Sequence, residues 1–406
     1  MPFPDPLLIY QLLVLLVLVG LMINTVINLF LMPSPGTENS ADKTPDPDPD
    51  FPQPLVSVLV PARNESGNIG PCVRSLVAQD YPQIEIIVLD DNSEDDTRSE
   101  AIEAARHNTS DVAFTVISGK PLPEGWGGKP WACHQLSEQA QGDWLLFTDA
   151  DTEHTPHAVS AALREAQIGG ATLFSAWPRQ RMGSWSEYLI IPMLYVLAVS
   201  MLPHIFQHIA RRFPGVFRYC PPSWSSVLGA ACGQFMLFSR KGYELVGGHA
   251  AFPDHLVEDV ALGRATMLAT AQGGALLNVD GRNLLTCRMY RDWAGLYEGF
   301  SKNLRPVFEG SWIQFVVTGW FHAVFLVAPF IWVWWMGGVT LWIVLAQIAV
   351  ILIVRLLLAL KFKTPLWVIL LHPISECLGL WIGLTSWWVA RTGRISWKGR
   401  EYKPDL

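Results

Sequence analysis

The sequence lacks an excess of basic residues. Its 406 residues include 29 lysines and arginines against 36 aspartates and glutamates, which gives a formal net charge of −7. A protein that binds nucleic acid needs a basic surface to neutralise the phosphates. The composition therefore excludes nucleic acid as a partner.

Closely paired cysteines are also missing. The six cysteines are scattered along the chain, and none has a histidine at the spacing of a zinc finger. Unpaired thiols are typical of a reducing compartment, so we expect the catalytic part of the chain to face the cytoplasm. Walker loops, glycine-rich dinucleotide fingerprints and serine nucleophile elbows are absent as well, so none of these motifs competes for a catalytic role.

Long apolar runs, in contrast, are abundant, and half of the residues are hydrophobic. From Leu7 to Met32 the chain is uncharged over more than the roughly 20 residues that a helix needs to cross a bilayer core. We therefore expect a transmembrane helix within residues 1–32. A cleaved signal peptide is the alternative, but the first residues, MPFPDP, lack the basic stretch of such peptides.

Further apolar stretches follow one another near residues 313–336, 339–360 and 366–390. The first two are expected to form a helical hairpin that leaves the cytoplasm and returns. We assign residues 306–390 to transmembrane or re-entrant helices and residues 391–406 to a basic tail.

The last of these stretches is unusual for a membrane span. It carries His372, Pro373 and Glu376 near its centre, and polar groups are costly in lipid unless they face protein or water. A single crossing would also separate the basic tail from Lys361 and Lys363, against the positive-inside rule. We therefore expect a broken or re-entrant segment that leaves the tail on the cytoplasmic side.

Another apolar run, residues 188–206, lies between acidic motifs that should share one site. A crossing there would separate these motifs by a bilayer. We expect instead a helix in the plane of the membrane surface, with Arg211 and Arg212 near the headgroups. A helix buried in the protein core is the alternative.

A soluble α/β domain is predicted between the membrane segments, after a proline- and aspartate-rich linker at residues 33–54. The runs LVSVLVPAR and IEIIVLDD are typical of strands buried on both faces of a parallel sheet, and a helix-like pattern separates them. Polar residues at the strand ends indicate an open sheet whose ligand site lies at the carboxyl ends of the strands. We assign residues 55–305 to this domain.

The segment DWLLFTDADTEHTP places two aspartates where a predicted strand ends. Asp149 and Asp151 are two residues apart, so in extended backbone their carboxylates project to the same side and can converge on one hard cation. A divalent metal held there would stabilise the diphosphate of a nucleotide sugar as a leaving group. Taken alone, the motif is equally well explained by a solvated turn.

A second acidic motif, FPDHLVEDVALGRA, begins an amphipathic helix with Glu258 and Asp259. Acids at a helix start commonly cap free amides and complement the dipole, so this motif also has a purely structural explanation. Sugar transfer to a hydroxyl with inversion needs a carboxylate that accepts the acceptor's proton. Asp259 is the candidate for that base.

Six spaced blocks resemble the family 2 glycosyltransferases of GT-A fold: VSVLVPARNES, VLDDNSEDDT, GKPWACHQL, LLFTDADT, GACGQFMLFSRKGYELVGGH and VEDVALGRA. The resemblance covers about residues 55–305 and implies a Rossmann-like nucleotide-sugar domain. The membrane segments on both sides narrow the resemblance to the lipid-acceptor and polysaccharide-synthase branch. Within that branch the sequence is most similar to bacterial carotenoid glycosyltransferases.

The resemblance implies a nucleotide pocket formed by residues that follow the first two strands: Pro61, Arg63, Asn64, Glu65 and Asp91. Lys129 is expected to approach the donor phosphates. Asp149 and Asp151 are expected to engage the nucleotide and a Mg²⁺ or Mn²⁺ ion, with Asp151 as the firmer metal ligand. Asp259 would be the base. Three more residues are expected near the sugar, the acceptor or the diphosphate: Gly233, Gln234 and Glu258.

One motif departs from the family pattern. Many relatives carry Gln or Arg, two spacers and Arg-Trp, whereas this chain reads RMYRDW, with Asp292 inserted before Trp293. Arg288, Arg291 and Trp293 are still candidates for diphosphate and acceptor binding. The altered spacing argues against a processive enzyme, because the motif commonly accompanies the terminal sugar of a polymer.

The sequence thus predicts an integral membrane enzyme of the cell inner membrane with a cytoplasmic catalytic domain. We expect an inverting, metal-dependent transferase that uses a nucleotide diphosphate sugar such as UDP-glucose and a lipid hydroxyl acceptor such as a carotenoid. A small processive polysaccharide synthase and an inactive membrane scaffold are the alternatives. The few candidate spans leave little room for a polymer channel, and the retained Asp149, Asp151 and Asp259 argue against a scaffold.

Overall fold

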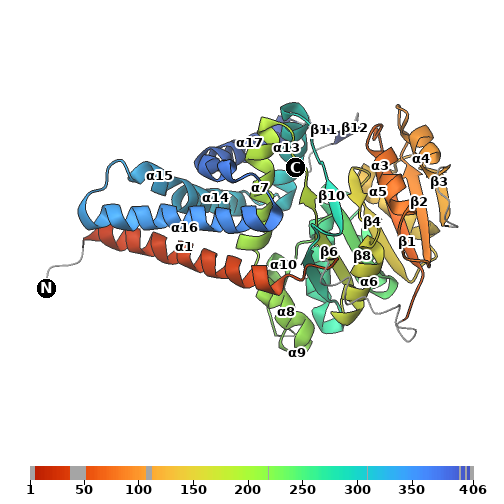
Figure 1. Cartoon of the computed structure of the whole chain (residues 1–406), viewed down its shortest axis with the longest axis horizontal. Helices are drawn as coiled ribbons and strands as arrows, with labels where there is room; N and C mark the ends of the chain where they lie inside the picture. The colour runs from red at the N-terminus through yellow and green to blue at the C-terminus, as the bar shows by residue number, and fades with distance from the viewer. Residues whose placement is uncertain are drawn as a thin grey trace. The chain divides into compact units, whose positions relative to one another are not determined.

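The computed structural model contains two compact units, coloured by chain position in Figure 1. It describes residues 5–36, 52–106, 112–217, 219–308, 310–392, 395–397 and 400–402. The sheet unit comprises Met32–Arg181 and His204–Met289. The helical unit comprises Met1–Leu31, Met182–Pro203 and Tyr290–Leu406. The predicted domain 55–305 therefore contributes to both units, and most of the predicted linker 33–54 lies outside the described residues.

A seven-stranded mixed sheet forms the centre of the sheet unit. Its strands are β1 (Val56–Ala62), β2 (Ile84–Asp90), β3 (Ala113–Ser118), β4 (Trp144–Thr148), β6 (Leu173–Trp177), β8 (Phe235–Ser239) and β9 (Leu276–Asp280). Their order across the sheet is β3-β2-β1-β4-β8-β6-β9. Among them β8 runs antiparallel to its neighbours β4 and β6, and the other pairs are parallel. The predicted α/β class is confirmed.

Helices cover both faces of this sheet. They are α3 (Ile69–Val77), α4 (Thr97–Arg106), α5 (Gly128–Gln139), α6 (Ala158–Ile168), α8 (His204–Arg212), α9 (Pro214–Phe217), α10 (Pro222–Val227), α11 (Arg240–Leu245) and α12 (Glu258–Leu268). Side chains alternate along β1: Val58 and Val60 pack in one cluster with α3, α4 and α6, and Leu59 packs in another with α5 and α12. This two-sided burial explains the continuous apolar runs in the sequence.

A small second sheet lies in the same unit. It contains β5 (Thr152–His154), β7 (Arg179–Gln180) and β10 (Leu285–Cys287), with β10 in the middle. Because β5 directly follows the Asp-Ala-Asp motif, its pairing with β10 brings Arg288 next to that motif. The backbone N–H of Arg288 donates to the carbonyl of Asp151 at 3.4 Å.

The helical unit is built from long apolar helices and short irregular turns. Its helices are α1 (Pro6–Leu31), α7 (Trp185–Tyr195), the π-helix η1 (Val196–Met201), α13 (Trp293–Val307), α14 (Trp312–Phe321), the π-helix η4 (His322–Val327), α15 (Ala328–Trp332), α16 (Gly338–Phe362), the 3₁₀-helix η5 (Leu366–Leu371) and α17 (His372–Thr392). Two short strands follow, β11 (Ile395–Trp397) and β12 (Arg400–Tyr402).

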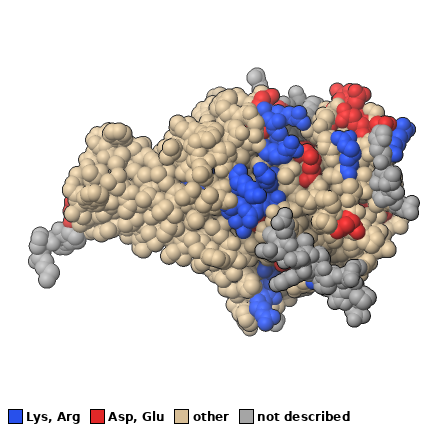
Figure 2. Space-filling view, in the orientation of Figure 1, with Lys and Arg blue, Asp and Glu red and all other residues tan. Residues whose placement is uncertain are grey.

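Four helical segments in the described part of the chain are long and apolar enough to cross a membrane: Pro6–Leu31, Trp312–Trp332, Gly338–Phe362 and Leu366–Val389. On the face shown in Figure 2, the surface of α1 and α16 carries almost no charged side chains. The predicted apolar segments at both ends of the chain therefore form helices.

The apolar run 188–206 is divided between several elements. It forms α7 and η1, then breaks at Leu202 and Pro203 before α8 begins. α7 contacts α17, η1 contacts α1 and α16, and Figure 1 shows α7 crossing α1 and α16 instead of following them. This arrangement fits the expected orientation in the plane of a membrane surface, which stays a prediction.

Side chains of α1 cap the end of η1. The Asn28 amide donates to the carbonyls of Val199 and Leu202, at 2.7 and 2.6 Å, and the Asn24 amide donates to that of Ser200 at 2.7 Å. The last carbonyls of a helix have no partner within the helix and must find one elsewhere. In apolar surroundings water cannot supply it, so α1 stabilises the end of this segment.

The last apolar helix, α17, runs antiparallel to α14. Near its start, Glu376 Oε2 lies 2.7 Å from His322 Nδ1, and Glu376 is 4% exposed. Near its end, the ring of Trp387 packs on those of Trp312 and Phe315, with centroids 5.1 and 5.5 Å apart. The polar Glu376 thus faces protein, as its position in an apolar segment requires.

The connection between α16 and α17 is too short for two parallel crossings. α16 packs back along α15 after a short turn, so α16 and α17 run in the same direction. Only residues 363–365 and η5 join them, and a 3₁₀-helix rises about 2 Å per residue. A bilayer core is about 30 Å thick. This geometry supports the re-entrant interpretation, and the side on which the basic tail lies stays a prediction.

The caps on η1 lead to a stability prediction. Replacing Asn28, which is fully buried, by leucine leaves the carbonyls of Val199 and Leu202 without these donors. We expect the free energy of unfolding to fall by about 1–3 kcal/mol. Thermal unfolding of the detergent-solubilised protein measures the effect. Phe30→Leu, at an 85% exposed position of the same helix, is the control, and an equal loss in both variants would contradict the prediction.

Candidate active site

The carboxyl ends of the parallel strands β1, β2 and β4 meet at one edge of the sheet. The predicted nucleotide-pocket residues lie at this edge. Arg63, just after β1, donates from Nη1 to the carbonyls of Asp91 and Asn92, both at 2.7 Å. The backbone N–H of Asp91 in turn donates to the Ala62 carbonyl at 2.8 Å. The loops after β1 and β2 are therefore held together.

Other predicted pocket residues shape the same loop. Pro61 pairs in register with Leu89 of β2. Asn64 has a φ of 50°, in the left-handed region that asparagine tolerates better than most residues. Glu65 Oε2 accepts from the Asn68 amide at 2.9 Å. The chain therefore turns sharply after β1, and this turn leads into α3.

Lys129 is the point where three elements converge. It lies in the first turn of α5, and its Nζ is 2.8 Å from Asp149 Oδ1, just after β4. The same Nζ is 2.9 Å from Glu258 Oε1, the first residue of α12. Burial acts to lower the pKa of Lys129, but the charges of these two carboxylates raise it well above its ordinary value. Lys129 is therefore protonated.

Asp259 lies close to Lys129, because both side chains approach Gly233. The backbone N–H groups of Gly233 and Val260 each donate to an Asp259 carboxylate oxygen at 2.8 Å. A Cβ added at Gly233 would lie 3.1 Å from Asp259 Oδ2 and 3.2 Å from Lys129 Nζ. Both charged groups thus approach the same glycine. Of the predicted site residues, Lys129, Asp149, Gly233, Glu258 and Asp259 are brought together.

The environment of Asp259 changes its protonation. Burial, and then the neighbouring charge of Glu258, raise the pKa of Asp259 to about 6, while Lys129 and the two backbone N–H groups act in the opposite direction. A carboxyl with this pKa is mostly ionised at neutral pH, and it is a stronger base than an ordinary aspartate. This protonation is compatible with a general base, and that role of Asp259 stays a prediction.

The Asp-Ala-Asp motif forms a turn and not the expected extended backbone, since the Thr152 N–H donates to the Asp149 carbonyl at 3.3 Å, and Asp151 lies close to buried thiols. After burial, the charge of Asp151 is the main contribution that raises the pKa of Cys287, and Asp149 adds to it. Both aspartates also raise the pKa of Cys72. Burial is the main cause for both thiols, and in the structure they are therefore protonated.

The donor set fits a metal that is shared with a substrate. Within the described residues, no three His, Cys, Asp or Glu side chains are grouped to hold a metal ion. Asp149 and Asp151 supply two hard carboxylate ligands at most. Mg²⁺ is commonly bound by one or two carboxylates, with substrate phosphates and water completing its shell. The residues present thus fit a divalent ion that binds together with a diphosphate.

Gln234 is engaged inside the protein. Its Nε2 donates to Cys287 Sγ at 2.9 Å, and its Oε1 accepts from Gln180 Nε2 at 2.8 Å. The residue is 4% exposed. Its contact with a sugar or an acceptor stays a prediction. Gln180 and Cys287 were missed, because neither stands in a recognisable motif.

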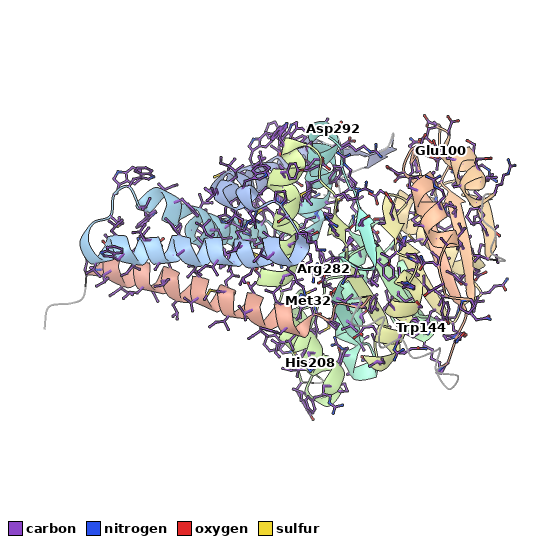
Figure 3. All side chains as sticks on the ribbon, in the orientation of Figure 1. Met32, Glu100, Trp144, His208, Arg282 and Asp292 are labelled. Carbon is purple, nitrogen blue, oxygen red and sulfur yellow. The ribbon has the colours of Figure 1, made fainter. Side chains whose placement is uncertain are left out.

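The residue inserted in the RMYRDW motif has a structural role. Asp292, labelled in Figure 3, is the N-cap of α13, and its Oδ1 accepts from the Gly295 N–H at 2.9 Å. Asp292 and Arg291 are exposed, and Trp293 is the first residue of the helix. The altered spacing thus serves helix initiation.

Trp293 belongs to a stack of aromatic rings within the helical unit. Its ring lies parallel to those of Trp185 and Trp381, with centroids 5.5 and 6.0 Å away and interplanar angles of 18°. Tyr297 stacks on Trp381 at 5.4 Å. Trp185 and Trp381 were not predicted, since nothing in the sequence relates these distant positions.

The part of the chain that carries these residues matches a known family. Residues 57–246 match the family model described as Glycosyl transferase family 2. This range contains the strand ends after β1, β2 and β4, together with Lys129 and Gly233. Glu258 and Asp259 follow shortly after it.

Curated relatives are named 4,4'-diaponeurosporenoate glycosyltransferase. The protein of Staphylococcus aureus strain MRSA252 is 26% identical over 267 residues, which are 63% of this chain and 62% of that protein. The protein of strain USA300 is 25% identical over 380 residues, which are 87% of this chain and 89% of that protein. The match thus spans less than two thirds of the first relative and most of the second.

A solved structure shares the fold. A mannosyltransferase from Pyrobaculum calidifontis, in complex with GDP-Man and Mn²⁺, is similar with a TM-score of 0.51 and 18% sequence identity, over 92% of this chain and 99% of that chain. At this identity the likeness concerns the fold alone. From the family match and the shared fold we conclude that the chain carries a family 2 glycosyltransferase domain of GT-A fold at residues 57–246.

Proposed function

We propose that the protein transfers a hexose, most simply glucose, from a nucleotide diphosphate donor to the hydroxyl of a lipid-like acceptor such as a carotenoid. One observation carries this proposal: the Lys129 ammonium group contacts Asp149 and Glu258, and both Lys129 and Asp259 approach Gly233. A cation, metal-binding carboxylates and a carboxylate base are the groups that inverting glycosyl transfer needs.

The donor would bind along the loops after β1 and β2. Arg63 and Asp91, with Pro61 and Glu65 near them, would hold the nucleoside, and Lys129 would approach the diphosphate. A divalent ion held by Asp149 and Asp151 would neutralise charge on the leaving diphosphate. Support for a metal and a nucleotide sugar comes from the mannosyltransferase of similar fold, whose complex contains GDP-Man and Mn²⁺.

Asp259 would take the acceptor's proton while the acceptor oxygen attacks the sugar's anomeric carbon. The nucleotide diphosphate leaves from the opposite face, so the configuration at this carbon inverts. Three residues are proposed to contact the acceptor or the diphosphate: Arg288, Arg291 and Trp293. The aromatic stack around Trp293 gives this proposal a flat apolar surface.

A lipid acceptor is supported by the apolar helices and by the relatives' names. The chain has four helical segments apolar enough to span a membrane, and the curated relatives are named for a carotenoid acid. An acceptor dissolved in a bilayer needs only an entrance at membrane level. We place the protein in the cell inner membrane with its catalytic part in the cytoplasm, on the side of Lys361 and Lys363.

A second candidate has a carboxylate acceptor in place of a hydroxyl. The ending of the relatives' name, diaponeurosporenoate, denotes a carboxylate. Such an acceptor is already ionised at neutral pH and would form a sugar ester without giving up a proton to a base. The two candidates therefore differ in their dependence on Asp259.

Replacing Asp259 by asparagine tests the proposed base. With a hydroxylated carotenoid in nanodiscs, and with UDP-glucose and GDP-mannose supplied in parallel, we expect transfer of radiolabelled sugar to fall by about 10²–10⁴-fold. Asp254→Asn, at an exposed position shortly before α12, is the matched control. Unchanged transfer to the hydroxyl by Asp259→Asn contradicts the proposal, whereas transfer only to a carotenoid acid supports the second candidate.

The raised pKa of Asp259 predicts a pH dependence. A base works as the carboxylate, and burial raises the pKa of this group to about 6, so protonation removes the base as the pH falls below that value. We expect kcat/KM to decrease by about tenfold per pH unit below this pKa and to level off above it. Initial rates between about pH 4.5 and 8 measure the profile. A rate that stays constant down to the lower limit would rule out this role.

A further inference from the structure

The ammonium group of Lys129 lies where a cation would approach Asp149. Its Nζ is 2.8 Å from Asp149 Oδ1 and 2.9 Å from Glu258 Oε1. These contacts join a residue of α5 to one that follows β4 and one that begins α12. In the structure, one lysine therefore balances carboxylates that come from two different elements.

A divalent ion and this ammonium group cannot share Asp149 without conflict. A metal bound to the carboxylate would bring two further positive charges close to Nζ, and like charges at such short range repel each other. Lys129 must therefore turn away before the metal binds. If Lys129 turns away and no other charge compensates, the Glu258 carboxylate loses its counter-charge inside the protein. This side chain is only 4% exposed.

A diphosphate removes this conflict. Its negative charges attract the ammonium group, and the four-carbon stem of a lysine allows the group to be re-aimed. A divalent ion that binds with the diphosphate can then take over the charge of Asp149. The re-aiming of Lys129 towards the diphosphate and the binding of the metal to Asp149 are therefore favourable together. Metal binding without a diphosphate is opposed by the ammonium group.

We propose that Lys129 is an internal counter-ion that excludes the divalent metal from Asp149 until the nucleotide diphosphate binds. This inference rests on the proposed function, since it takes Asp149 as a metal ligand and Lys129 as a phosphate-binding residue. Its consequence is an order of binding in which the metal arrives with the donor or after it. Without the donor, the site would stay free of metal at metal concentrations that saturate the complex with the donor.

Metal binding without catalysis tests the inference. Mn²⁺ alone is titrated into the purified full-length protein in detergent, and free Mn²⁺ is measured by electron paramagnetic resonance. For Lys129→Met we expect binding about 10–100-fold tighter than for the wild type, the usual range of coupling between two sites. Lys129→Arg keeps the charge and should resemble the wild type. Lys241→Met, at an exposed position of α11, is the control and should not change the affinity.

Nucleotide diphosphate provides the second measurement. UDP or GDP should tighten Mn²⁺ binding to the wild type and should have a much smaller effect on Lys129→Met, where the site is already open. Should Lys129→Met not fold, Lys129→Gln removes the charge and keeps a hydrogen-bond donor for Asp149 and Glu258. We expect this variant to bind Mn²⁺ more tightly than the wild type, and binding that is no tighter overturns the inference.

The possible failures are distinguishable. Equal Mn²⁺ affinity in wild type and Lys129→Met, with weaker binding in Asp149→Asn, overturns the exclusion by Lys129 and keeps the proposed metal ligand. Mn²⁺ binding that is indifferent to Asp149→Asn but weakened by Asp151→Asn overturns the inference and keeps a metal in the proposed function. Binding that is indifferent to both variants, with and without UDP or GDP, overturns the metal assignment of the proposed function and the inference with it.

Discussion

The site depends on the two ion pairs of Lys129. Asp149 follows β4 and Glu258 begins α12, and their negative charges would repel each other without a cation between them. Glu258 is too deeply buried for water to replace that cation. The same ammonium group acts against the rise in the pKa of Asp259 that burial causes. One side chain thus links the position of α12 to the protonation of the proposed base.

Much of the sheet was predictable from local sequence. Runs such as Val56–Ala62 and Ile84–Asp90 are apolar without interruption, and only strands covered on both faces use such a pattern in a short segment. Because parallel strands bring their carboxyl ends to one edge, a ligand site was expected where these strands end, and Arg63 does contact the Asp91 carbonyl there. The family resemblance was needed to select Lys129 among the many lysines of the chain.

The remaining features depend on tertiary partners that no local pattern encodes. Gln234 was predicted near a substrate, yet its amide is bonded to Gln180 and Cys287, which lie far from it in sequence. The ion pairs of Lys129 join three distant segments, and the α7–η1 helix changes its hydrogen-bond spacing where other helices pack on it. Hydropathy predicts that these helices are apolar, but it does not predict which of them pack against each other.

The amides of Asn24 and Asn28 give α1 a specific function in the helical unit. A helix that only anchors a protein can be exchanged for any apolar sequence of the same length. α1 cannot, because its register must present two amides, one turn apart, to the end of η1. Side-chain identity in this helix therefore matters as well as hydrophobicity: a foreign helix of equal hydrophobicity would leave the carbonyls at the end of η1 without these donors.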